Sequence, residues 1–221
     1  MNDKLKKFLL FLALLISYLT FELIYYVIAD IVNFDMNNLT FNDTLILNII
    51  KFIFYTILLF VIYRKYLIEK WQDFKKNFAK YFDISLKYWL TGLVIMYISN
   101  IIITMFTNDI GQNEQNVQNI INNSPLIALS MTTIFAPFIE EMIFRKSLQD
   151  CFTNKTLFII ISGFIFGYLH IMGLNELILI IPYGSLGIAF AYILSKTNNI
   201  YCTILMHMLH NGLATILSMV I

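Results

Sequence analysis

Three short groups of polar residues interrupt apolar stretches in the second half of the chain. They are Glu140-Glu141 with Arg145, Phe166 with His170, and His207 with His210 and Asn211. An ionisable side chain at mid-membrane costs several kcal/mol, about 3 on insertion scales, so it persists where a function or a partner compensates. The inventory suits hydrolysis, because a carboxylate can activate water, imidazoles can hold water or a metal, and an amide can stabilise an oxyanion.

The first group separates two carboxylates by their angle on a helix. Glu141 and Arg145 are four residues apart, so they share a face and can pair. Glu140 is turned about 100° away, which leaves its carboxylate without a local cation. Pro137 lies one turn earlier and removes a backbone donor, so a kink there could admit water. For Glu141 and Arg145, a charged helix end at the lipid headgroups is the alternative interpretation.

The second group combines an imidazole with a glycine pair. Phe166 and His170 are four residues apart and share a face. Gly163 and Gly167 form a GxxxG pair, which lets a neighbouring helix approach closely. The alternative is that His170 only makes a hydrogen bond between helices.

The third group places two imidazoles and an amide within five residues of an apolar segment. His207 and Asn211 are four residues apart, and His210 lies at a neighbouring angle. Such a group is not expected to face lipid. A polar seam with a purely structural role is the alternative.

Composition places these groups in a membrane protein. The 221 residues are 59% hydrophobic and only 13% charged, whereas soluble domains have about 25% charged residues. The apolar run from residue 8 to residue 29 is longer than the core of a signal peptide, so we interpret it as a retained first span. Stretches of suitable length predict an all-α bundle of about seven spans, at 8–29, 45–63, 88–107, 125–144, 156–172, 176–194 and 199–220.

Basic residues predict a cytosolic N-terminus. Of the 15 Lys and Arg residues, 14 fall in the segments 1–7, 64–87, 145–155 and 195–198. By the positive-inside rule these segments face the cytosol. The outer segments 30–44, 108–124 and 173–175 contain no Lys or Arg. The exception is Lys51, near the outer end of the second span, from where its long side chain can reach the interface.

The chain has one integral membrane domain with two parts, 1–124 and 125–221. Segment 64–87 mixes aromatic residues with lysines, which favours an amphipathic helix on the inner leaflet over a plain loop. Cys151 and Cys202 both fall on the inner side, so we expect free thiols. The net charge of +1, with dispersed basic residues, gives no argument for nucleic acid as a partner.

At the three polar groups the sequence resembles the CAAX-protease and bacteriocin-processing family of intramembrane peptidases, also called the Abi family. That family has the pattern EExxxR, then FxxxH, then HxxxN or HxxxD, on successive core helices. The same motifs occur here in the same order, within roughly residues 125–215. The resemblance implies a helical bundle with a catalytic cavity open to the cytosol and the membrane.

By analogy with the family, Glu140 would activate water, and His170 and His207 would position it or bind a metal. Asn211 would stabilise the oxyanion, while Glu141 with Arg145 would support the site; Phe166 and His210 are further supporting candidates. Glu140, His170 and His207 would satisfy a catalytic zinc ion, yet a metal-free glutamate mechanism fits the same residues.

The predicted spans place the site residues at different depths. Glu140 would lie about 8 Å from the inner end of its span and His170 about 21 Å from the inner end of the next. These depths converge if the fourth helix continues to about Asp150 or the fifth begins deeper. We therefore predict that 146–150 stays helical.

The leading hypothesis is an endopeptidase in a bacterial plasma membrane that cleaves a membrane-associated peptide or protein near the cytosolic face. A non-enzymatic bacteriocin-immunity or interaction protein is the second hypothesis. A small transporter with a Glu and His proton relay is the third, although no inverted repeat supports it. Substrate, metal requirement and oligomeric state stay open.

Overall fold

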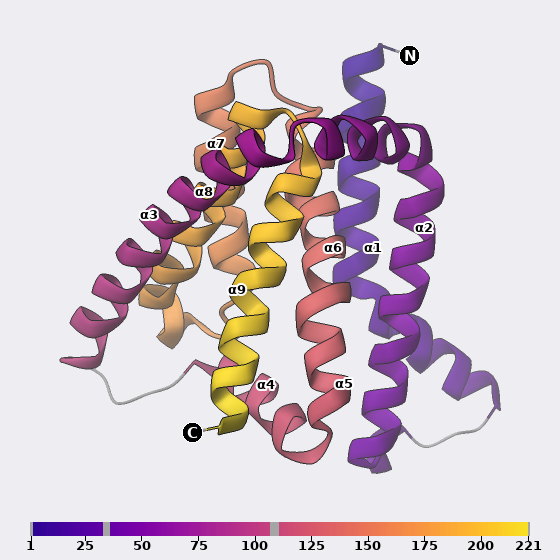
Figure 1. The fold of residues 1–221 in the computed structure, drawn as a ribbon. Coiled ribbons are helices and arrows are strands. Elements are labelled where there is room, and N and C mark those ends of the chain that lie inside the picture. The colour runs from indigo at the N-terminus through magenta and orange to yellow at the C-terminus, as the bar shows by residue number, and fades with distance from the viewer. Residues whose placement is uncertain (1, 33–35, 107–110, 221) are drawn as a thin grey trace.

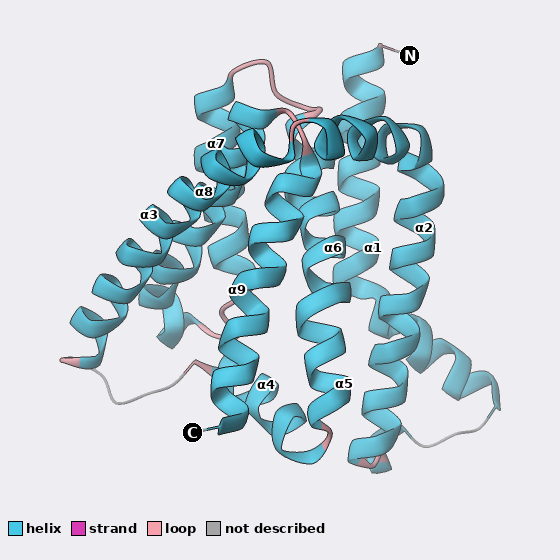
Figure 2. Ribbon diagram, viewed as in Figure 1, coloured by secondary structure: helices cyan, strands magenta, loops and turns pink. Residues whose placement is uncertain are grey.

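The computed structural model describes residues 2–32, 36–106 and 111–220, which form a bundle of helices without strands (Figures 1 and 2). Residues 33–35 and 108–110 of the predicted outer segments, and residue 107 of the predicted third span, lie outside the described residues. Within the described ranges, six helices are long and apolar enough to cross a membrane: Asp3–Val32, Phe41–Lys76, Phe78–Thr104, Pro125–Ser147, Leu174–Thr197 and Ile200–Val220. The predicted all-α fold is confirmed, and the chain is a multi-pass membrane protein.

The element bounds are α1 Asp3–Val32, η1 Met36–Asn38, α2 Phe41–Lys76, α3 Phe78–Thr104, α4 Gln112–Asn123, α5 Pro125–Ser130, η2 Met131–Phe135, α6 Ala136–Glu141, η3 Met142–Ser147, α7 Lys155–Leu169, η4 Leu174–Leu179, α8 Ile180–Thr197 and α9 Ile200–Val220. The predicted fifth span, 156–172, corresponds to α7, which is apolar but has only 15 residues.

Burial divides the bundle into a core and a periphery. In the most apolar windows of α1, α2 and α3, 17% of the residues are buried, against 56% in the window of 174–197 and 44% in α9. The outward faces of the first three helices carry many exposed Leu, Ile, Val and Phe side chains, which suit contact with lipid. With 39% buried in the window of 125–147, the spans that carry the first and third motifs and the span at 174–197 form the more protected part of the bundle.

The fourth predicted span is a continuous helix with two wide turns. Residues 131–135 and 142–147 form the π-helical segments η2 and η3, on either side of α6. In η2 the Ala136 N–H bonds the Met131 carbonyl five residues back, and the next residue, Pro137, has no N–H. The helix continues through Gln149, with Asp150 in a turn, so the predicted extension beyond Arg145 is confirmed.

Helices α7 and α8 pack closely through glycines, as the GxxxG pair predicts. A Cβ atom added to Gly163 would lie 2.3 Å from Ile188 Cγ1, and one on Gly167 would lie 2.7 Å from the Ile180 carbonyl oxygen. Both distances are too short for a real side chain, so only glycine allows this approach. The contact fixes the end of α7, where His170 follows directly.

Gly167→Ala should therefore destabilise the protein, because the new methyl group meets backbone atoms of α8 that cannot move alone. We expect a loss of about 1–3 kcal/mol, the usual cost of overpacking, seen as a lower thermal unfolding midpoint in detergent. Gly184→Ala is the matched control on the opposite helix, since its nearest neighbour would be 3.4 Å away. Equal midpoints for the two variants would contradict this account of the packing.

The basic segments gather at one end of the bundle, at the top of Figure 1. The predicted inner helix 64–87 is divided there: 64–76 continue α2 after a bend at Tyr63, and 78–87 begin α3. The Asn199 side chain donates to the Lys70 carbonyl (2.8 Å) and to Asp73 Oδ2 (2.9 Å). These bonds connect segment 64–76 to the start of α9. Cys151 and Cys202 are free thiols, as expected.

Glu22 and Lys51, the ionisable residues of the first two spans, form an ion pair between α1 and α2. Lys51 Nζ lies 3.3 Å from Glu22 Oε1 and 4.8 Å from the centre of the Tyr18 ring. The pair explains how both charges are accommodated among apolar residues. The Lys51 side chain is 14% exposed, so it contacts Glu22 and Tyr18 rather than extending to the interface as predicted.

Candidate active site

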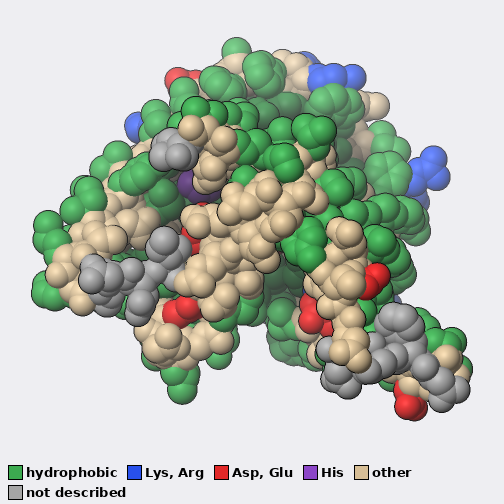
Figure 3. All heavy atoms as spheres, turned by 90° about the horizontal axis from the view of Figure 1, so that it is seen from below, with side chains coloured by type: hydrophobic (Ala, Val, Ile, Leu, Met, Phe, Trp, Pro, Cys, Tyr) green, Lys and Arg blue, Asp and Glu red, His purple; other side chains and the backbone are tan. Residues whose placement is uncertain are grey.

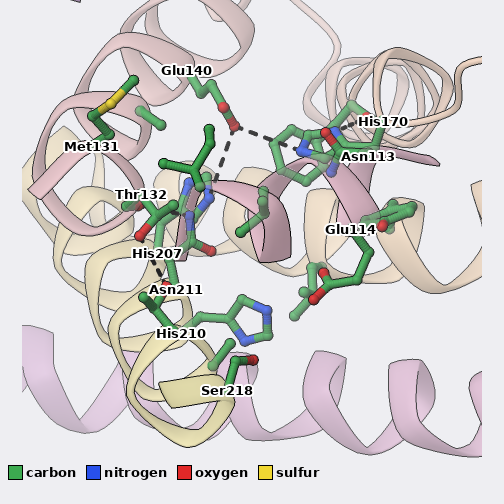
Figure 4. A pocket seen from close by; sticks show the side chains of 18 of the residues that line it. Asn113, Glu114, Met131, Thr132, Glu140, His170, His207, His210, Asn211 and Ser218 are labelled. Carbon is green, nitrogen blue, oxygen red and sulfur yellow. Dashed lines mark hydrogen bonds and ion pairs between the residues drawn. The ribbon is translucent and has the colours of Figure 1, made fainter. Parts of the chain in front are cut away.

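Glu140 lies between two imidazoles that come from other helices. Its Oε2 atom is 3.9 Å from His170 Nε2 and 3.9 Å from His207 Nε2 (Figure 4). Glu140 comes from α6, His170 caps the C-terminal end of α7, and His207 lies in the first half of α9. The structure thus brings together three residues that the sequence analysis placed on three separate spans.

The other ring nitrogen of each histidine fixes its tautomer. His170 Nδ1 lies 2.7 Å from the Phe166 carbonyl oxygen, and His207 Nδ1 lies 2.9 Å from Glu141 Oε1. A carbonyl or carboxylate oxygen only accepts, so we assign the proton of each neutral ring to Nδ1. The Nε2 lone pairs of both rings therefore face Glu140.

Three acceptor atoms consequently surround one small volume. A separation of 3.9 Å is too long for a direct hydrogen bond, but it suits a water molecule at about 2.8 Å from each atom. Glu140 Oε2 is buried and has no hydrogen-bond partner within the part of the chain that the structure describes. The arrangement is therefore complementary to a group that donates protons, such as water.

Glu141 and Arg145 form a fully buried pair behind these residues. Arg145 Nη1 lies 3.4 Å from Glu141 Oε1, and both side chains have zero exposure, so the predicted pairing is confirmed and the headgroup alternative is excluded. The guanidinium group stacks 4.0 Å from the centre of the Phe166 ring. Arg145 thus balances Glu141, whose carboxylate in turn orients His207.

Two aromatic residues of α8 hold the imidazole rings flat against them. The ring centres are 4.9 Å apart both for His170 with Tyr183 and for His207 with Phe190, and both pairs are stacked. Neither aromatic residue belongs to the three polar groups that the sequence indicated. Their i,i+7 spacing places them on one face of the predicted sixth span, and that is the signal that could have indicated them.

Asn211 binds a carbonyl group that the wide turn η2 releases. The Ala136 N–H bonds the Met131 carbonyl, and Pro137 offers no N–H, so the Thr132 carbonyl is free to accept from Asn211 Nδ2 at 3.0 Å. This bond joins α9 to the helix that carries Glu140. The second N–H of the amide is still available to a ligand. His210 lies farther from Glu140 in the same view (Figure 4).

These side chains line one cavity of about 330 Å³. Besides the motif residues it is lined by Tyr18 and Phe52 of α1 and α2, and by five residues of α4: Asn113, Glu114, Val117, Ile120 and Ile121. Helix α4 belongs to the predicted outer segment 108–124. The cavity therefore adjoins the end of the bundle opposite the basic segments.

The donor types Glu140, His170 and His207 would suit zinc. Their spacing does not, because no group of three or more His, Cys, Asp or Glu side chains among the described residues is placed to hold a metal ion. We therefore derive no catalytic step through a metal.

Comparison with known proteins supports the resemblance. Residues 122–213 match the family model described as "Type II CAAX prenyl endopeptidase Rce1-like". This segment of the chain is therefore similar to that family. It contains all three motifs and corresponds closely to the predicted range of 125–215, whereas α1 to α3 and nearly all of α4 precede it.

Relatives extend the similarity beyond the family segment. A Bacillus subtilis protein named "Putative membrane peptidase YdiL" is 32% identical over 111 residues, which cover 49% of this chain and 43% of that protein. An uncharacterized Mycoplasma capricolum protein is 29% identical over 66% of this chain and 46% of its own length. A Lactococcus lactis protein, "UPF0177 protein YxdF", is 26% identical over 60% of this chain and 77% of its own length. The chain thus spans less than half of the first two relatives, and no solved structure matches it.

Proposed function

We propose that this protein is an intramembrane endopeptidase in which Glu140 activates a water molecule for attack on a peptide bond. The observation that carries the proposal is the approach of Glu140 Oε2 to both His170 Nε2 and His207 Nε2, at 3.9 Å in each case. The similarity to the Rce1-like family and to a protein named as a membrane peptidase supports the same activity.

The water molecule would be held by acceptors on two sides. One of its protons faces Glu140 and the other faces an imidazole Nε2 lone pair, so its oxygen lone pairs are directed at the substrate. Glu140 takes a proton as the oxygen attacks the carbonyl carbon, and the carbonyl π electrons move to its oxygen. The second N–H of Asn211 would stabilise that oxyanion.

Collapse of the tetrahedral intermediate completes the reaction. The carbonyl double bond re-forms, the C–N bond breaks, and protonated Glu140 gives its proton to the departing amine. The products are a carboxylic acid and an amine, and Glu140 returns to its charged state. The fixed Nδ1 protons keep both rings in orientation throughout, because Phe166 and Glu141 hold them from behind.

Comparative peptidomics tests the proposal. Membranes of a host that lacks the gene are complemented with the wild-type chain, with Glu140→Ala or with Glu69→Gln as the control. We expect a set of cleavage products with the wild type and the control that is absent with Glu140→Ala. Identical peptide sets in all strains at equal protein levels would refute the peptidase and favour a non-enzymatic immunity or interaction role.

The mechanism also predicts that chelators leave the activity intact. Since the carboxylate itself activates water, removal of divalent metal with EDTA or phenanthroline should leave the rate of peptide cleavage in proteoliposomes unchanged. The measurement is the initial rate before and after chelation. Loss of activity that added zinc restores would show that the two histidines and Glu140 close around a metal instead.

A further inference from the structure

The two ends of the bundle differ in charge and are each held together by their own contacts. At the basic end, Lys155 Nζ donates to the Ser195 carbonyl at 3.3 Å, which links two segments predicted to face the cytosol. At the other end, Glu176 accepts from the backbone N–H of Gln112 (2.7 Å) and of Met172 (2.9 Å). The predicted inner and outer segments thus assemble at opposite ends.

The space-filling view of the second end shows the same separation. Figure 3 looks at the end opposite the N-terminus, where acidic side chains and a histidine are visible within the face. Lys and Arg side chains are visible only near the margin of this view. An inner membrane surface would be expected to present basic residues here.

Helix α4 places the cavity on this side. It packs against α5 and α9 and contributes five residues to the cavity wall. Its first residue shares the Glu176 carboxylate with Met172, two residues after His170, so α4 is fixed next to the catalytic imidazole. Among the described residues that line the cavity there is no Lys or Arg.

From these contacts we infer that the cavity is reached from the outer side of the membrane, past α4, and that its occupant is a peptide segment already exported from the cytosol. The apolar residues Val117, Ile120 and Ile121 offer contacts to apolar side chains, while Asn113 and Glu114 offer polar ones. A wall with a carboxylate and no cation favours neutral or positively charged segments over acidic ones.

The inference rests on the proposed function for the nature of the occupant, but the side of access does not depend on activity. Labelling of single cysteines in intact cells tests on which side of the membrane α4 lies. Asn119 lies on the exposed face of α4, and Lys80 is exposed at the predicted inner end of α3. The two single-cysteine variants are Asn119→Cys and Lys80→Cys. Both are made in a Cys151→Ser background, and Cys202 is retained because it is buried (1% exposed).

A membrane-impermeant maleimide is applied to intact and to permeabilised cells. We expect Asn119→Cys to be labelled in both and Lys80→Cys only after permeabilisation. Asn116→Cys and Lys76→Cys, also exposed, replace either position if it does not react in permeabilised cells. Any other pattern in intact cells, above all labelling of the α3 position alone, overturns outer access. An inactive protein with the expected labelling would instead refute the peptidase and leave the access route standing.

Discussion

Replacing Glu140 with glutamine should lower the rate of peptide hydrolysis by about 100- to 10,000-fold, the contribution typical of a general base. An amide of the same shape cannot take a proton from water. The fold should be unaffected, because Glu140 Oε2 has no hydrogen-bond partner among the described residues and its side chain is 15% exposed in the cavity. The measurement is the initial rate in proteoliposomes, together with the thermal unfolding midpoint.

Glu69→Gln is the matched control for that experiment. It makes the same chemical change at the basic end of the bundle, where the Glu69 carboxylate is 74% exposed and lies 3.6 Å from Lys70 Nζ. Such an exposed pair contributes less than about 1 kcal/mol, so rate and stability should both stay close to wild type. A Glu140→Gln protein that keeps more than a small fraction of the wild-type rate would rule out Glu140 as the base.

Arg145→Met should have the largest effect on stability. The substitution leaves Glu141 fully buried without its cation, and removal of one partner of a buried pair typically costs about 3–5 kcal/mol. It also removes the guanidinium group that stacks on Phe166. We expect a strongly lowered unfolding midpoint in detergent and little folded protein in the membrane.

The double variant Glu141→Gln with Arg145→Met separates charge from packing. Because it removes both charges, it should recover part of the stability that the single variant loses. It should not recover activity, since Glu141 orients His207 through a 2.9 Å hydrogen bond. If Arg145→Met alone were as stable as wild type, the pair could not be the support of the site that we describe.

Spacing along single helices made much of the site predictable. Positions four residues apart placed Glu141 beside Arg145 and turned Glu140 toward other helices. The glycine pair in α7 indicated a close helix contact, which the structure locates at α8. The apolar stretches indicated the spans, because the length of a membrane helix is set by the thickness of the bilayer.

Contacts between helices could not be predicted in the same way. Tyr183 and Phe190 stack on the imidazoles only because α8 packs against α7 and α9, and no motif marks that choice. Pro137 indicated a kink in this helix. It did not indicate the π-helical segment η2, which leaves the Thr132 carbonyl free to accept from Asn211. Helix α4 was not predicted. Its polar sequence indicated an outer loop, whereas the structure shows a helix that forms a wall of the cavity.

Two imidazole lone pairs meet the carboxylate of Glu140, and nitrogen-15 solid-state NMR of the protein in lipid tests this arrangement most directly. The chain has only three histidines, so His170→Gln and His207→Gln suffice to assign the signals. We predict that His170 and His207 carry their proton on Nδ1, and that Glu140→Gln shifts both Nε2 resonances while leaving the Nδ1 protons in place. Protonation of either ring on Nε2 would contradict this arrangement. Nε2 resonances that stay unshifted in Glu140→Gln would contradict it as well.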